Sequence, residues 1–173
     1  MASLEPKAAK KGASVSPGNA DDSARTFTDG SAALAFLASR VNVETTRPTS
    51  IDAGKVFTLE RITAVLDALG NPHREFKSVH VAGSKGKGSV CEMTASCLEA
   101  CGYTVGLYTS PHLVDPFERI RINQRKVGSA EFANLLMRVL AAEATLPKSL
   151  GQATHFELFT ACAFLHFADQ AVD

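Results

Sequence analysis

Apolar residues recur at helical spacing in several stretches of the chain, which predicts a protein rich in helices. The clearest stripe is formed by Ile62, Val65, Leu66 and Leu69. Thr58 precedes this stripe and is expected to cap the helix, which the Gly70-Asn71-Pro72 sequence would end. On this reasoning we expect helices over residues 31–41, 58–69, 89–100, 130–144 and 156–168.

Short β-rich runs flank a glycine-rich loop. KSVHVA, residues 77–82, is typical of a buried strand, and TVGLYT, residues 104–109, predicts a second strand. A smaller strand is expected over 119–122, and residues 171–173 look like the start of another. Strand, glycine loop, helix and strand in this order form a βαβ unit. The sequence therefore predicts the α/β fold class, with a parallel sheet flanked by helices.

Residues 1–25 are small and polar and lack a periodic apolar pattern, so we expect them to form a disordered tail. A transit peptide is the alternative interpretation. Glu5, Asp21 and Asp22 argue against it, because such peptides avoid acidic residues. The chain has 173 residues, which is long enough for one ordinary domain with a hydrophobic core.

Composition narrows the classes of function. Hydrophobic residues make up 45% of the chain and charged residues 21%, which is typical of a globular protein. Lys and Arg total 18, and Asp and Glu total 18, so no basic excess points to nucleic acid or to an anionic membrane. No apolar run approaches the roughly 20 residues of a membrane helix, and we therefore expect a soluble, cytoplasmic protein. The four cysteines lack a C-x-x-C spacing and are expected to be buried, reduced thiols.

The loop within HVAGSKGKGSV has the parts of a phosphate-binding site. Gly83, Gly86 and Gly88 allow the backbone to turn its N–H groups inward, and the helix expected from Ser89 adds the positive end of a dipole. Lys87 stands at the helix entrance, where its ammonium group can reach a terminal phosphate. The spacing departs from the Walker pattern G-x-x-x-x-G-K-[ST], so a solvated connection without a ligand is the alternative.

Three motifs occur in order along the chain: VAGSKGKGS, GYTVGLYTSPHLVDPFERIRIN and THFELFTACAF. Together they resemble the folylpolyglutamate synthase and dihydrofolate synthase family of the Mur ligase superfamily. The first is similar to the family's phosphate loop, G-T-[NK]-G-K-G-S, with Ser84 in place of the usual threonine. The resemblance runs from about Ala33 to the last residue, and residues 115–117 depart from the family pattern.

This resemblance implies an ATP-dependent ligase of folate biosynthesis. Members of the family join L-glutamate to the carboxylate of a folate or of dihydropteroate through an acyl phosphate, with ATP and Mg²⁺ as cofactors. The motifs do not separate dihydrofolate synthase from folylpolyglutamate synthase or from a bifunctional enzyme. The implied partners are these small molecules, with no nucleic acid and no membrane, and the protein is expected to be a monomer.

The resemblance also implies roles for individual residues. The phosphates of ATP are expected to contact Gly83, Ser84, Lys85, Gly86, Lys87, Gly88 and Ser89. Lys87 is the expected catalytic residue, as the charge partner of the transferred phosphoryl group. Ser110 and Glu157 are implied as Mg²⁺ ligands, and oxygen donors suit this ion. Without the family, Ser110 would be interpreted as a turn residue and Glu157 as a solvated helix charge.

A second set of residues is implied to bind the pterin-bearing substrate. It consists of His112, Glu118 and Arg119. Each has a structural alternative: His112 as a cap of its loop, and Glu118 with Arg119 as an ordinary ion pair. Lys85 in the glycine loop has the alternative of being only solvated.

A non-catalytic nucleotide-binding module, or a truncated remnant, is the alternative class of function. In the family, the strand that begins like residues 171–173 continues into most of the enzyme. The resemblance therefore leads us to expect that the C-terminal glutamate-ligase domain is absent from this chain. We therefore interpret residues 26–173 as the N-terminal portion of the ATP-binding domain and expect no turnover by this chain alone. We also expect apolar helix faces that include Leu158, Phe159 and Leu165 to lack their full covering.

Overall fold

The computed structural model describes residues 25–42 and 58–173. The predicted tail, and the transit peptide considered as its alternative, lie outside these described residues except for Arg25. In chain order the elements are α1 (Gly30–Ala38), α3 (Glu60–Ala68), the short 3-10 helix η2 (Pro72–Arg74), α4 (Lys87–Ala100), β1 (Gly106–Tyr108), η3 (Pro116–Arg119), β2 (Ile120–Ile122), β3 (Arg125–Lys126), α5 (Ser129–Ala144), η4 (Lys148–Leu150) and α6 (His155–Asp169).

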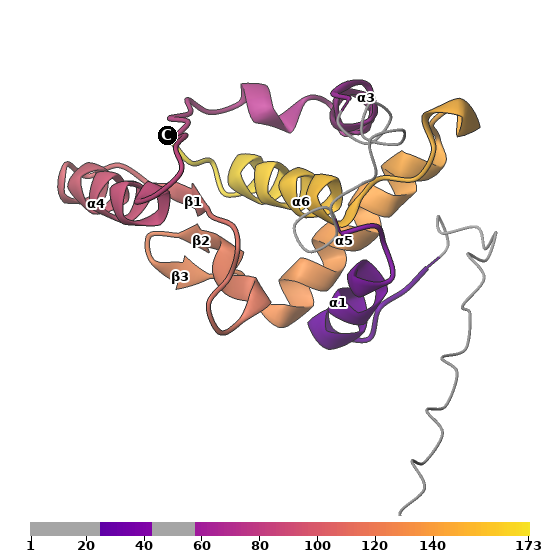
Figure 1. Cartoon of the computed structure of the whole chain (residues 1–173), viewed down its shortest axis with the longest axis horizontal. Coiled ribbons are helices and arrows are strands. Elements are labelled where there is room, and N and C mark those ends of the chain that lie inside the picture. The colour runs from indigo at the N-terminus through magenta and orange to yellow at the C-terminus, as the bar shows by residue number, and fades with distance from the viewer. Residues whose placement is uncertain (1–24, 43–57) are drawn as a thin grey trace, which may run out of the picture.

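Helices α5 and α6 form the centre of the core, with α1 and α3 packed against them (Figure 1). Phe132 and Leu136 of α5 are fully buried, and so is Leu158 of α6. The expectation that Leu158, Phe159 and Leu165 lack covering is wrong, since these side chains are 0%, 1% and 4% exposed. The apolar stripes that predicted the helices meet one another in this cluster, which removes their faces from water.

The strands form one three-stranded sheet in the order β1-β2-β3, and both pairings are antiparallel. Leu107 of β1 lies opposite Arg121 of β2, and Ile122 of β2 lies opposite Arg125 of β3. The combination of helices and strands was predicted correctly, but the parallel sheet is wrong for the described residues. Residues 109–119, which include η3, connect β1 to β2 and reverse the direction of the chain, so the two strands pair as antiparallel neighbours.

The segment predicted as a buried strand, residues 77–82, is not a strand in the structure, and most of it is exposed. Val79 is 71% exposed, and the backbone N–H of Lys77 donates to the carbonyl of Asp173 at 3.3 Å. The predicted strand at 171–173 is also wrong: Ala171 has a left-handed φ of 49°, although the N–H of Asp173 reaches the carbonyl of Thr104 at 3.0 Å. A buried strand requires neighbours on both edges, and the described part of the chain does not supply them here.

The helix ends follow the predictions only in part. Leu59, not Thr58, occupies the N-cap of α3 and makes no side-chain capping bond, so the predicted cap is wrong. The predicted end is confirmed, because Gly70 and Asn71 adopt left-handed φ angles of 84° and 63° that stop the helix. Among the described residues, no helix combines the length and the apolar character needed to cross a membrane.

All four cysteines are free thiols, but their predicted burial is confirmed only for Cys162. Burial raises the pKa of the Cys162 thiol well above its usual range. Cys91 is half-buried, and Cys97 and Cys101 are exposed. Cys91 and Cys97 lie on α4, and Cys101 is its C-cap residue. This helix packs against β1 at the edge of the molecule (Figure 1) rather than in the helical core.

Candidate nucleotide and metal site

The glycine-rich loop opens directly into α4. Gly86 is the N-cap of this helix and has a left-handed φ of 75°, and Gly83 has a φ of 151°. Both conformations are easy for glycine and strained for other residues. Lys87 is the first helical residue, and its Nζ donates to the carbonyl of Gly83 at 2.7 Å. The lysine side chain therefore folds back over its own loop, and its ammonium group contacts the first glycine of the loop.

The start of α4 is open to solvent and has no side-chain cap. The first backbone N–H groups of an α-helix have no partner within the helix, and they carry its positive dipole end. No atom outside the local chain lies within 4 Å of a Cβ built at Gly86 or at Gly88. The loop therefore has both the donors and the space that an anionic group requires.

Gly86 and Gly88 provide a matched pair for testing this loop. Gly86→Ala is expected to cost about 1–2 kcal/mol of the free energy of unfolding, because alanine is strained at positive φ although it meets no neighbour. Gly88→Ala lies inside the helix and is expected to add up to about 1 kcal/mol, because alanine favours helices. Urea denaturation of both variants gives the two values. Equal changes in the two variants would contradict this assignment of backbone strain.

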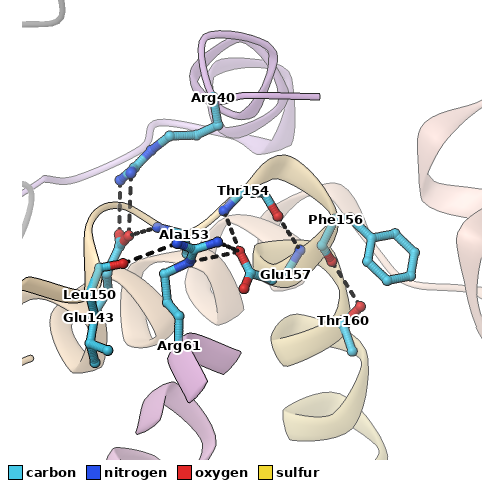
Figure 2. A network of polar contacts seen from close by, with 9 residues as sticks. All are labelled: Arg40, Arg61, Glu143, Leu150, Ala153, Thr154, Phe156, Glu157 and Thr160. Carbon is cyan, nitrogen blue, oxygen red and sulfur yellow. Dashed lines mark hydrogen bonds and ion pairs between the residues drawn. The ribbon is translucent and has the colours of Figure 1, made fainter. Parts of the chain in front are cut away.

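The second part of the candidate site is the N-terminus of α6, shown in Figure 2. Thr154 caps this helix: its Oγ1 accepts from the N–H of Glu157 at 3.2 Å, and its own N–H donates to Glu157 Oε2 at 2.7 Å. Arg61 of α3 donates from Nε to the same Oε2 at 2.9 Å, and its Nη2 forms an ion pair with that oxygen at 2.8 Å. The Glu157 side chain is buried, and its charge is balanced by the arginine.

The other carboxylate oxygen of Glu157, Oε1, is buried and has no hydrogen-bond partner among the described residues. A buried carboxylate oxygen without a donor is costly, and a divalent cation would satisfy it. The residue therefore fits the predicted magnesium ligand. No group of three or more His, Cys, Asp or Glu side chains in the described ranges is arranged to hold a metal. An ion at Glu157 would accordingly need hydroxyl, phosphate or water oxygens as well, which is how Mg²⁺ is usually bound.

Ser110, the other predicted magnesium ligand, lies on the exposed loop that follows β1. Tyr108, at the end of β1, connects this loop to α6, since its hydroxyl lies 3.2 Å from Thr160 Oγ1. Its ring also lies 6.2 Å from that of Phe156. Thr160 is one helical turn beyond Glu157, so the chain approaches the first turns of α6 two residues before Ser110.

The three predicted substrate residues lie together in the loop between β1 and β2. Arg119 is buried, donates from Nε to His112 Nδ1 at 2.9 Å, and has its guanidinium 5.1 Å from the centre of the Phe159 ring. Glu118 accepts hydrogen bonds from the backbone N–H groups of Leu113, Val114 and Asp115. The bond from Leu113 is the largest cause of the lowered pKa of Glu118. These contacts hold the loop together.

Sequence reasoning missed Arg61, which is 7% exposed and balances the negative charge of Glu157. A signal was present, because Arg61 lies one helical turn before Val65 on the face of α3 that is directed to the core. It also missed the second buried ion pair, in which Arg40 Nη2 lies 2.8 Å from Glu143 Oε2. Their partners lie about a hundred positions away in the chain, so spacing alone did not reveal either pair.

Comparison with known proteins bears on what this arrangement does. No protein-family model matches the chain. A dihydrofolate synthase/folylpolyglutamate synthase of Bacillus subtilis is 39% identical over 112 residues, covering 64% of this chain and 26% of that protein. The structure of a folylpolyglutamate synthetase from Lactobacillus casei matches with a TM-score of 0.72 at 34% identity, covering 84% of this chain and 35% of that one.

A Mycobacterium tuberculosis folylpolyglutamate synthase complexed with ADP and AMPPCP also matches, with a TM-score of 0.62 and 38% identity, over 67% of this chain and 27% of that one. The fold of the described part is thus shared with synthases of this class. The chain is a relative of the folylpolyglutamate synthase and dihydrofolate synthase family, as its three motifs indicated. It spans about a quarter of the length of the B. subtilis protein.

Proposed function

We propose that this chain supplies the phosphate-binding part of an ATP-dependent ligase that joins L-glutamate to the carboxylate of a folate or of dihydropteroate. The observation that carries the proposal is the open glycine loop at the start of α4, with Lys87 as the first residue of the helix. The proposal is also supported by the similar synthases of this family, because the chain shares their fold and one of them was solved in complex with ADP and AMPPCP.

In this proposal the loop residues 83–89 hold the phosphates of ATP. Backbone N–H groups at the start of α4 donate to the phosphate oxygens, and Lys87 leaves the Gly83 carbonyl to neutralise the γ-phosphoryl group. The substrate carboxylate attacks this group and gives an acyl phosphate and ADP. The amine of glutamate then displaces phosphate and forms the amide. Positioning and charge neutralisation account for most of the catalysis in such transfers.

Glu157 and Ser110 are the residues that would hold Mg²⁺. Glu157 offers the buried oxygen Oε1, and Ser110 offers a hydroxyl on the loop that Tyr108 ties to α6. When bound, the ion would supply additional positive charge to the phosphate oxygens. His112, Glu118 and Arg119 shape the loop beside this position, and we propose that the pterin-bearing substrate lies against that loop.

Replacing Lys87 tests the proposal most directly. Lys87→Ala is expected to weaken ATP binding by roughly 10–100-fold, because it removes charge-assisted hydrogen bonds worth about 1.5–3 kcal/mol. Isothermal titration with ATP and Mg²⁺ measures the affinity. Lys77→Ala is the control, since this exposed lysine lies in the segment that leads to the loop. Equal ATP affinity in the wild type and in Lys87→Ala would refute the loop assignment.

A second measurement on the same variants addresses turnover. We propose that the 173-residue chain binds ATP but does not incorporate labelled L-glutamate into dihydropteroate or tetrahydrofolate, because it spans only about a quarter of the length of the synthase that it resembles. Incorporation by the wild-type chain that disappears in Lys87→Ala would overturn this part of the proposal. Comparing the two acceptors would then identify the substrate.

A further inference from the structure

We propose that Arg61 is a positioning residue that fixes the carboxylate of Glu157 so that the single oxygen Oε1 faces a divalent cation. This inference rests on the proposed function, because it concerns the same magnesium position. It adds a residue that lies outside the three family motifs and on a different helix, α3.

The guanidinium of Arg61 is held at three points, which leaves it little freedom. Its Nε donates to Glu157 Oε2 at 2.9 Å, and its Nη1 donates to the carbonyl of Leu150 at 3.0 Å (Figure 2). Its Nη2 forms an ion pair with Glu157 Oε2 at 2.8 Å and, among the described residues, has no hydrogen-bond partner. Arginine is suited to this arrangement because its donors are fixed in one plane. The position of the planar guanidinium group therefore determines the position of Oε2, the oxygen that it contacts.

All donors to the Glu157 carboxylate meet at one of its two oxygens. The N–H of Thr154 donates to Oε2 at 2.7 Å, beside the two nitrogens of Arg61. Oε1 is also buried but receives no hydrogen bond from the described residues. A carboxylate anchored in this way cannot rotate to exchange its oxygens, so it presents Oε1 alone.

The neighbouring buried pair makes this asymmetry informative. Arg40 binds both oxygens of Glu143, through Nη1 to Oε1 at 3.3 Å and through Nη2 to Oε2 at 2.8 Å. Glu143 Oε1 also accepts from the N–H of Ala153 at 2.5 Å. The side chains of Glu143 and Glu157 are each 10% exposed. The carboxylate of Glu143 thus uses both of its oxygens, whereas that of Glu157 leaves one unused.

Charge and geometry predict opposite effects of removing Arg61. A positive group beside a cation position repels the cation, so electrostatics alone predicts tighter metal binding without the arginine. Loss of the guanidinium group would let the Glu157 carboxylate rotate, so that Oε1 would no longer be held toward the cation. This effect predicts weaker metal binding. Groups that orient a metal ligand typically contribute about 10–100-fold to metal affinity, and we expect this effect to be the larger one.

The experiment titrates Mn²⁺ into the chain saturated with AMPPCP and follows bound Mn²⁺ by electron paramagnetic resonance. Arg61→Met is expected to weaken Mn²⁺ binding by about 10–100-fold. Arg61→Lys is expected to lose less, because it keeps the charge but not the planar fork. Arg40→Met is the matched control, since it breaks the other buried pair and is expected to leave Mn²⁺ affinity unchanged. AMPPCP affinity in EDTA should be the same in all of them.

Unchanged or tighter Mn²⁺ binding in Arg61→Met would overturn the inference. If this variant does not fold, Arg61→Lys decides, and wild-type affinity in that variant would overturn it. An equal loss in Arg40→Met would also overturn it, since the effect would then be one of stability. Glu157→Gln separates the two proposals. If Glu157→Gln binds Mn²⁺ as the wild type does, the metal position itself is wrong; if only the Arg61 variants keep wild-type affinity, the positioning role alone fails.

Discussion

Replacing Phe132 by alanine is expected to cost about 3–5 kcal/mol of the free energy of unfolding, as large-to-small changes of buried aromatic residues do. Phe132 is fully buried on α5, and its ring centre lies 5.5 Å from that of Phe117 and 5.1 Å from that of Phe159. It therefore fills the space between the loop of His112 and Arg119 and the helix of Glu157. Alanine at this position would leave a cavity beside these two elements, and the apolar surface that the ring buries would be lost.

Urea denaturation followed by circular dichroism measures this loss. Phe156→Ala is the matched control, because Phe156 is 38% exposed and less buried surface is lost with its ring. We expect a clearly smaller destabilisation in that variant. A loss of less than about 1 kcal/mol in Phe132→Ala would mean that the three rings do not form a packed unit.

Breaking the Arg61–Glu157 pair is expected to have an effect of similar size. Arg61→Met should destabilise the chain by about 3–5 kcal/mol, because it leaves the Glu157 carboxylate buried with only the N–H of Thr154 to compensate its charge. The double variant Arg61→Met, Glu157→Leu should recover much of this stability. The reason is that two apolar side chains of similar volume can replace a buried pair at little cost.

A surface pair provides the control for this prediction. Arg138 and Asp169 join α5 to α6 as Arg61 joins α3 to α6, but their side chains are 44% and 35% exposed. Arg138→Met is expected to cost no more than about 1 kcal/mol, because solvent screens such pairs. Denaturation of the three variants under the same conditions gives the comparison. The absence of any recovery in the double variant would show that Arg61 contributes through its packing rather than through its charge.

The sequence alone was sufficient to predict where the helices lie and where the glycine loop turns. The helical stripe of Val65 and Leu66 and the stops at Gly70 and Asn71 are local features, and local features decide where a helix lies and ends. The same holds for Gly86 and Lys87, because a turn that requires positive φ selects glycine within a few residues.

Only the tertiary structure decided the orientation of the strands, the exposure of α4 and the environment of Glu157. A short β-rich run does not reveal its neighbours, so residues 77–82 were predicted to pair in a parallel sheet, whereas β1 pairs with β2 instead. The pairing of Arg61 with Glu157 joins residues 96 positions apart. No local pattern specifies such a contact, because it depends on how α3 and α6 pack, and packing depends on every residue of the shared core.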